Sequence, residues 1–219
     1  MRINKFIASA TGLSRRTADV AIANGRVRVN GEQPNAGDQI TSEDVVTLDG
    51  KQLQAKATLQ TILLNKPVGY IVSRDGQGGQ TVYDLLPANL HHLKPVGRLD
   101  KDSSGLLVLT NDGDLANRLT HPSYQKEKVY QISLDKPLAP ADQKAIEQGV
   151  QLEDGVSKLR LEGAGKDWKI SMSEGRNRQI RRTFSHLHYR VVSLHRHRFG
   201  SYQLDNLKEG SYQSIDTND

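Results

Sequence analysis

Cysteine is absent from all 219 residues of this chain, which excludes disulfide bonds and thiolate metal ligands. The chain also lacks an uninterrupted apolar run of about 18 residues, the length that a membrane-spanning helix needs. Its opening, MRINKFIASATGL, has no long apolar core of the kind found in secretory signals. We therefore expect a soluble, cytoplasmic protein with one or two domains.

Positive charge is unevenly distributed along the chain. Lys and Arg number 30 against 25 Asp and Glu, a net charge of +5. Residues 1–30 contain six basic side chains and one acid, and residues 174–198 contain seven arginines, four histidines and one acid. Either of these two basic segments alone fits a solvent-exposed protein surface. Two arginine-rich islands favour a polyanionic partner, because guanidinium groups bind phosphate in a bidentate manner and release condensed counterions.

The first fifty residues are predicted to form a small separate domain. Residues 3–10 carry apolar side chains at helical spacing, and Ser14 can cap a second helix that stops near Gly25. The segment GRVRVNGE alternates in polarity and ends in an Asn-Gly turn signal, and DVVTLDG supplies another short strand. Residues 51–58 are polar with few bulky side chains and predict a linker.

Residues 59–219 are predicted to form a second domain of the α+β class. Strands outnumber helices and do not alternate strictly with them, which favours a largely antiparallel sheet over a doubly wound parallel one. The last ten residues are expected to fray, and no internal repeat is present. Strands are predicted within residues 59–73, 105–110, 128–134, 157–163 and 167–175, and helices within 113–121, 140–149 and 178–188.

The segment GRLDKDSSGLLVLTNDG, residues 97–113, sets a charged turn against the start of a buried strand. The carboxylate of Asp100 belongs either to a solvated loop or to a reactive site, and the heptapeptide LDKDSSG alone favours the loop. Asp102, Asp112 and Asp114 serve as comparisons within the same stretch. We expect them to be solvated or to cap a helix that begins near Leu115.

Three further segments decide between these readings. INKFIASATGLSRRTADVAIANGRVRVNG resembles the S4-type RNA-binding module, and GRLDKDSSGLLVLTNDG, KVY and EGRNRQIRR resemble, in this order, the motifs of bacterial ribosomal RNA pseudouridine synthases of the Rsu-like group. EGRNRQIRR is closest to the branch that acts on large-subunit, 23S ribosomal RNA. Thr183 stands where the group has methionine, and the chain is short for the group.

The resemblance spans nearly the whole chain and implies an S4-like α/β domain over residues 1–50 and a catalytic domain over residues 59–219. The catalytic domain is expected to have the pseudouridine synthase fold, a largely antiparallel mixed sheet flanked by helices. The implied partner is structured ribosomal RNA, and we expect a monomer. The reaction breaks the N1–C1′ bond of uridine and joins C5 to C1′ without redox change, so it needs no metal or other cofactor.

This chemistry needs a carboxylate near C1′ and a pocket that retains and turns the detached uracil. By resemblance Asp100 is that carboxylate, and whether it attacks C1′ or removes a proton from C2′ stays open. Arg176 is expected to pair with Asp100 and keep it ionised. Arg181 and Arg182 are alternative partners that we expect instead to contact phosphate.

The resemblance also assigns the residues around the base. Tyr130 is expected to lie against the uracil and assist proton removal, and Ile180 to pack on the other side, although both also fit an ordinary core. Arg98 is expected to fill the space that the flipped nucleotide leaves, or to clamp a phosphate. Further RNA contacts are expected from Lys5, Arg15, Arg16, Arg26, Arg28, Lys66, Lys101, Lys126, Lys128, Arg181 and Arg182.

Two histidine pairs, at 186 and 188 and at 195 and 197, have a spacing that on a strand points both rings to one side. Such a pair can bind metal, but no carboxylate joins either pair at a recognisable ligand spacing. Because arginines interleave with these histidines, we expect contacts with the RNA backbone and phosphates instead, and no metal site.

Three rival functions stay open. A ribosome-associated binding factor without catalysis needs none of Asp100, Tyr130 and Arg176, so the presence of all three argues against it. A nucleoside hydrolase based on a carboxylate usually needs a second acid or a metal close by. A synthase acting on small-subunit, 16S ribosomal RNA is the third alternative.

Overall fold

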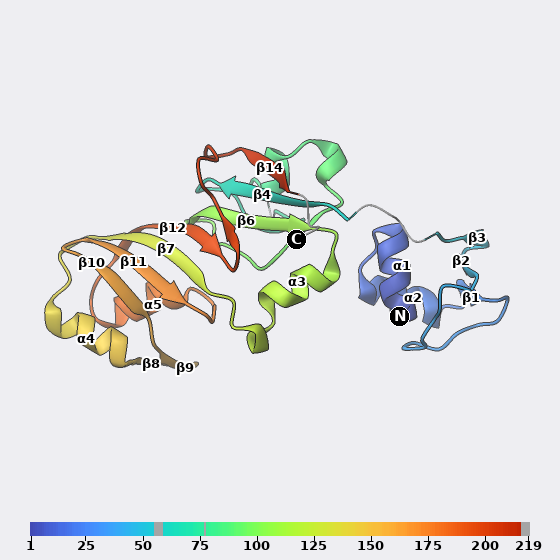
Figure 1. Cartoon of the computed structure of the whole chain (residues 1–219), viewed down its shortest axis with the longest axis horizontal. Helices are drawn as coiled ribbons and strands as arrows, with labels where there is room; N and C mark the ends of the chain where they lie inside the picture. Colours follow the sequence, from blue (N-terminus) through green and yellow to red (C-terminus); the bar gives the residue numbers. More distant parts are fainter. Residues whose placement is uncertain (55–58, 77, 216–219) are drawn as a thin grey trace. The chain divides into compact units, whose positions relative to one another are not determined.

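Two helices and a small sheet share one core in the N-terminal unit, Met1–Thr58 of the computed structural model (Figure 1). The structure describes residues 1–54, 59–76 and 78–215. Helix α1 covers Ile3–Thr11 and α2 covers Arg15–Ala23. As predicted, Ser14 caps α2, accepting a hydrogen bond from the Thr17 amide at 3.0 Å. The apolar faces of both helices pack against strands β1 (Val27–Val29) and β2 (Val46–Leu48).

The predicted linker begins too early. Strand β3 (Lys51–Gln52) pairs with β2 in an antiparallel manner, and the Leu53 amide donates to the Val46 carbonyl at 2.8 Å. Asp49 and Gly50 make the connecting turn with positive φ values of 50° and 76°. The sequence did not predict this edge strand because its side chains are polar and exposed, and such a strand needs no apolar pattern. Residues 55–58 of the predicted linker lie outside the described residues.

The second unit, Leu59–Asp219, is built on one mixed sheet with strand order β10-β11-β7-β12-β6-β4-β14. Neighbouring strands are antiparallel except β12 and β6, which are parallel. The α+β class and the largely antiparallel mixed sheet are therefore confirmed. Its strands are β4 (Thr61–Lys66), β5 (Lys94–Pro95), β6 (Ser104–Thr110), β7 (Lys128–Leu134), β10 (Arg160–Ala164), β11 (Asp167–Met172), β12 (Val191–Phe199), β13 (Tyr202–Gln203) and β14 (Tyr212–Ile215); β8 (Val150–Leu152) and β9 (Gly155–Ser157) form a separate hairpin.

Helices cover both faces of this sheet (Figure 1). Residues 107 and 109 of β6 join the apolar layer that contains α4 (Pro140–Gln148) and α5 (Gln179–His186), and residues 106 and 108 join the layer of α3 (Gly113–Thr120). A strand buried on both faces reads as a continuous apolar run, which explains LLVL. Short 3₁₀ turns follow at Val82–Leu85, Ala88–Leu90 and Pro122–Tyr124. No helix in the described ranges is long and apolar enough to cross a membrane.

Strands β12 and β14 are among the strands that the sequence did not predict. Strand β12 occupies the centre of the sheet, although its interleaved arginines and histidines resemble an exposed basic segment. Strand β14 pairs with β4 from Tyr212 opposite Leu64 to Ile215 opposite Thr61, so the prediction of a frayed tail is wrong for these residues. Residues 216–219 of that tail lie outside the described part of the chain.

The parallel contact of β6 and β12 depends on Gly105. Its φ is +105°, and an added Cβ would lie 2.3 Å from the carbonyl oxygen of Arg196 and 2.5 Å from its amide nitrogen. Only glycine fits this backbone conformation and this close approach. The loop of residues 97–103, which carries Asp100, is thereby joined at its end to the middle of β12.

Candidate active site

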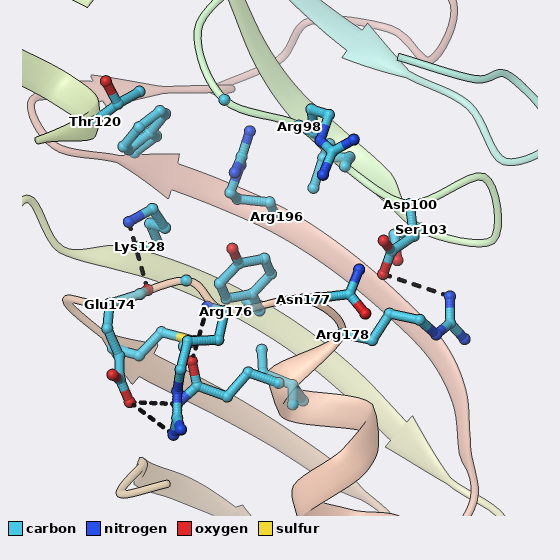
Figure 2. Close-up of a pocket in the computed structure, with 18 of the residues that line it drawn as sticks. Arg98, Asp100, Ser103, Thr120, Lys128, Glu174, Arg176, Asn177, Arg178 and Arg196 are labelled. Carbon is cyan, nitrogen blue, oxygen red and sulfur yellow. Dashed lines mark hydrogen bonds and ion pairs between the residues drawn. The ribbon is translucent and has the colours of Figure 1, made fainter. Parts of the chain in front are cut away.

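A cavity of about 580 Å³ opens where the loop before β6, the start of β7, the end of β11 and the start of α5 come together. Five side chains that the sequence predicted for the site line it: Arg98, Asp100, Tyr130, Arg176 and Ile180. Motifs that lie far apart in the chain, from Arg98 to Ile180, thus meet around one cavity (Figure 2). The same cavity is also lined by Lys126, Lys128, Arg178, Arg181 and Arg196.

Lys66, at the end of β4, holds the loop that carries Asp100. This side chain is fully buried, and its Nζ donates to the carbonyls of Ser103 at 2.6 Å, Pro67 at 2.9 Å and Asp100 at 3.1 Å. These acceptors use all three N–H groups of an ammonium. Burial lowers the pKa of Lys66 to about 8, against the opposing charges of the nearby acids. The prediction that Lys66 lines an RNA path is therefore wrong.

The Asp100 carboxylate faces Arg178 (Figure 2). Arg178 Nη1 lies 3.5 Å from Asp100 Oδ2, and the same guanidinium donates to both oxygens of Asp102 at 2.8 Å. This bidentate contact with Arg178 lowers the pKa of Asp102. The Asp100 side chain is 35% exposed. Asp100 thus combines a cationic neighbour with access to a cavity.

Of the two comparison acids Asp102 and Asp112, the first differs from expectation and the second agrees with it. Asp102 is neither simply solvated nor a cap, because it binds Arg178. Asp112 does cap α3, accepting from the amides of Asp114 and Leu115 at 2.8 and 3.1 Å. Of the acids in this stretch, Asp100 is the one that lines the cavity.

Arg176 does not pair with Asp100, and that prediction is wrong. Its Nη1 donates to Asp154 Oδ1 at 2.9 Å and to the Gly155 carbonyl at 3.0 Å, and its Nη2 donates to the Val156 carbonyl at 2.8 Å. The left-handed backbone of Arg178, with φ of 46°, turns the chain between the two arginines. In Figure 2 Arg176 consequently points toward Glu174 and Arg178 toward Asp100. Arg176 ties the entry to α5 to the β8–β9 hairpin.

Arg181 and Arg182 also bind within the protein. Arg181, 12% exposed, donates to the carbonyls of Val191 at 2.8 Å and Asp102 at 2.7 Å. Arg182 donates to both oxygens of Asp154 at 3.0 and 2.7 Å. Both guanidinium groups are thus held by acceptors of the protein, but Arg181 lines the cavity and the Arg182 side chain is 32% exposed, so their contact with phosphate stays a prediction. The two side chains instead join α5 to β12, the Asp100 loop and the β8–β9 hairpin.

Tyr130 and Ile180 are both largely buried, at 7% and 5% exposed, and both line the cavity from β7 and α5. Their rings and methyl groups belong to the main apolar cluster of the second unit. The Tyr130 hydroxyl forms no hydrogen bond with any residue in the described ranges. Tyr130 and Ile180 thus belong to the hydrophobic core and also line the cavity, and the hydroxyl oxygen of Tyr130 is available to a ligand.

The predicted RNA-binding residues of the N-terminal unit differ in their engagement. Arg15 and Arg16 are exposed at the start of α2. Arg26 is exposed but binds Asp49, with Nε donating to Oδ1 at 2.8 Å, and Arg28 donates to Gln33 at 3.3 Å. Lys5 on α1 is half-buried. Among these five predicted residues, Arg15 and Arg16 are therefore the most available for RNA.

The histidine pairs form no recognisable metal site. The rings of His195 and His197 lie 4.7 Å apart, and His195 Nδ1 lies 2.9 Å from the hydroxyl of Ser104. Across the residues that the structure describes, no group of three His, Asp or Glu side chains could hold a metal ion.

Comparisons with known proteins agree with this architecture. A family model described as RNA pseudouridylate synthase matches residues 60–186, and an S4 domain model matches residues 1–46. An uncharacterized RNA pseudouridine synthase of Aquifex aeolicus is 36% identical over 225 residues, covering 98% of this chain and 90% of that protein. A solved pseudouridylate synthase structure superposes with a TM-score of 0.72 at 34% identity, covering 99% of this chain and 96% of that one.

Two further relatives carry more specific names. The ribosomal small subunit pseudouridine synthase A of Salmonella typhimurium is 37% identical over 222 residues, covering 98% of this chain and 96% of that protein. The dual-specificity RNA pseudouridine synthase RluF of Escherichia coli K12 is 34% identical over 223 residues, covering 98% of this chain and 75% of that protein. The named relatives therefore include different RNA specificities.

Proposed function

The chain belongs to the RNA pseudouridylate synthase family, and we propose that it isomerises a specific uridine of ribosomal RNA through the carboxylate of Asp100. In this reaction the N1–C1′ bond breaks, the C5–C1′ bond forms, N1 gains a proton and the C5 proton passes to solvent. Atoms and electrons balance without an oxidant or reductant.

The observation that carries the proposal is the position of Asp100 beside Arg178 at the cavity. A carboxylate that attacks C1′ and one that removes the C2′ proton both act as anions, so both routes gain from a guanidinium 3.5 Å away. An ordinary loop acid needs neither the guanidinium nor the cavity. Lys66 supports this assignment, because its three hydrogen bonds fix the backbone of the Asp100 loop.

We assign the uracil to the part of the cavity between Tyr130 and Ile180. Both side chains present apolar surface there, and the Tyr130 hydroxyl keeps its hydrogen-bonding capacity for the base or its C5 proton. Arg98 is exposed at the rim of the same cavity, where it can fill the space that the everted nucleotide leaves.

RNA docking is assigned to the S4 domain, chiefly to Arg15 and Arg16. Both are exposed at one helix start, a position from which arginine reaches phosphate oxygens. Phosphate contacts set the position of the enzyme on the RNA, and the flipped base with the local RNA shape supplies selectivity.

The target RNA has two candidates. We propose 23S ribosomal RNA first, since EGRNRQIRR resembles the motif of the large-subunit branch. A uridine of 16S ribosomal RNA is the second, because the relative named for the small subunit is 37% identical and is matched over 96% of its length.

The proposed reaction is tested by incubating the protein with separately purified 16S and 23S ribosomal RNA that carries tritium at uracil C5. Tritium released to water from one RNA, with pseudouridine mapped to one position in it, supports the proposal and identifies the target. Free uracil in the supernatant would indicate a hydrolase instead. The absence of release from both RNAs, as naked RNA and in assembly intermediates, would leave an RNA-binding factor.

A further inference from the structure

Five of the cationic side chains that line the cavity fall into two groups. Arg176, Arg178 and Arg181 are engaged with carboxylates and backbone carbonyls of the protein. Arg196 and Lys128, from β12 and β7, form no ion pair with any acid in the described ranges. A buried charge without a counter-charge is costly to the folded protein. Arg196 is such a buried charge, and the half-buried Lys128 is attracted by the charge of Glu174 but forms no ion pair with it, so this second group can accept an anion from outside the protein.

Of Arg196 and Lys128, Arg196 gives the stronger evidence for a bound anion. It is 2% exposed, and its Nε donates to the Leu106 carbonyl at 2.8 Å, which fixes the guanidinium. Neither terminal nitrogen donates to a described residue, and Nη2 is fully enclosed. The guanidinium lies 4.9 Å from the centroid of the Phe199 ring. Figure 2 shows it in the cavity between Arg98 and Lys128.

Lys128 shares the same aromatic ring. Its Nζ lies 5.1 Å from the Phe199 centroid and 3.4 Å from the carbonyls of Ser173 and Glu174. Burial, and next the charge of Arg196, lower the pKa of Lys128. Two cations thus converge on one ring and repel each other, and an anion with two oxygens between them would relieve that repulsion.

We propose that Arg196 and Lys128 form a binding subsite for a phosphodiester group of the RNA, the one attached to the everted uridine. The proposal rests on the proposed function, which brings that nucleotide to the cavity. A uracil ring is neutral and cannot offset two positive charges, whereas a phosphodiester carries a full negative charge and two free oxygens.

The strand register fits this assignment. Arg196 lies opposite Tyr130 in the β12–β7 pair, and Lys128 lies two residues before Tyr130 on the same face of β7, about 6.7 Å away. A nucleotide whose base contacts Tyr130 therefore has its phosphate within reach of both cations. Held there, the backbone keeps the ribose in place while the uracil detaches and turns.

The subsite is tested by titrating the full chain with uridine 5′-monophosphate, uridine 3′-monophosphate and uridine by calorimetry. We expect one monophosphate to bind about tenfold or more tightly than uridine, since hydrogen bonds to charged groups are among the strong ones. The better monophosphate identifies the phosphate that is held. Arg196→Met should reduce this preference to about twofold or less, and Arg196→Lys should restore part of it. Arg190→Met, an exposed arginine just before β12 with the same charge change, should leave it unchanged.

Equal binding of uridine and both monophosphates, or no binding of either monophosphate, would overturn the subsite. Retention of the preference in both Arg196→Met and Lys128→Met would also overturn it. If urea unfolding shows that Arg196→Met does not fold, Lys128→Met carries the test. Tritium release by the wild type without a phosphate preference refutes the subsite alone, and a preference without release refutes the proposed reaction alone.

Discussion

Replacement of Lys66 by methionine tests how the Asp100 loop is held. Three carbonyls that accept at 2.6, 2.9 and 3.1 Å would lose their donor. At about 2 kcal/mol for each unsatisfied buried carbonyl the loss is about 6 kcal/mol. Removal of a buried charge offsets about 3 kcal/mol of this, because burial holds the pKa of Lys66 at about 8 instead of about 10.4, and a tenfold change in proton affinity corresponds to roughly 1.4 kcal/mol. We expect Lys66→Met to lower the free energy of unfolding by about 3 kcal/mol.

The same residue predicts a pH dependence. Lys66 has a pKa of about 8 in the folded chain and about 10.4 when exposed, so the unfolded chain binds more protons between these values. The contribution of Lys66 to stability therefore rises with pH through this window. The stability difference between wild type and Lys66→Met should widen by about 2 kcal/mol from pH 7 to pH 10. Urea unfolding at both pH values measures it.

Activity measurements on Lys66→Met distinguish a role of Lys66 in holding the Asp100 loop from a role in RNA binding. A shifted Asp100 should reduce kcat about 100-fold, with little change in RNA affinity or in its salt dependence. Lys144→Met removes the same charge from an exposed position on α4, to which no RNA contact is assigned, and serves as the control. A Lys66→Met protein that keeps its stability within about 0.5 kcal/mol and loses RNA affinity would refute this reasoning.

Three further predictions concern the sheet, the acids and the S4 domain. Gly105→Ala should cost more than about 3 kcal/mol, or prevent folding, because its Cβ meets backbone atoms of β12; a urea midpoint equal to wild type would contradict this. Arg178→Gln should raise the pKa of Asp102 toward the ordinary value of an aspartate, measured by carboxyl NMR titration, and an unchanged pKa would show that Arg178 does not set it. Arg15→Glu with Arg16→Glu should weaken RNA binding and flatten its salt dependence while leaving turnover of a short saturating RNA intact; an equal loss of turnover would contradict a docking role.

Local patterns predicted much of the fold. The Ser14 cap, the two N-terminal helices and the apolar run of β6 follow from short-range rules, and the structure has each of them. Strand β12 was missed because its alternation places Arg196 inward, and a buried arginine reads in a sequence as an exposed one. Its inward direction depends on Gly105 and Leu106 of a strand ninety residues away.

The partners of the charged side chains were the least predictable part of the site. EGRNRQIRR offers four arginines within seven residues, and composition does not rank them as partners of Asp100. The choice of Arg178 follows from its left-handed backbone and from Asp102, which binds both terminal nitrogens of the same guanidinium. Lys66 was likewise assigned to the surface, since only the tertiary structure shows three carbonyls converging on it.

The central claim is that the carboxylate of Asp100 drives the isomerisation. Asp100→Asn keeps the shape of the side chain and removes its charge, and Asp205→Asn makes the same change at an exposed position that tolerates asparagine at its φ of 42°. Asp102 is unsuitable as the control because it binds Arg178. Single-turnover tritium release from C5-labelled ribosomal RNA should vanish in Asp100→Asn and persist at the wild-type rate in Asp205→Asn. Release by Asp100→Asn within about tenfold of wild type would contradict the account.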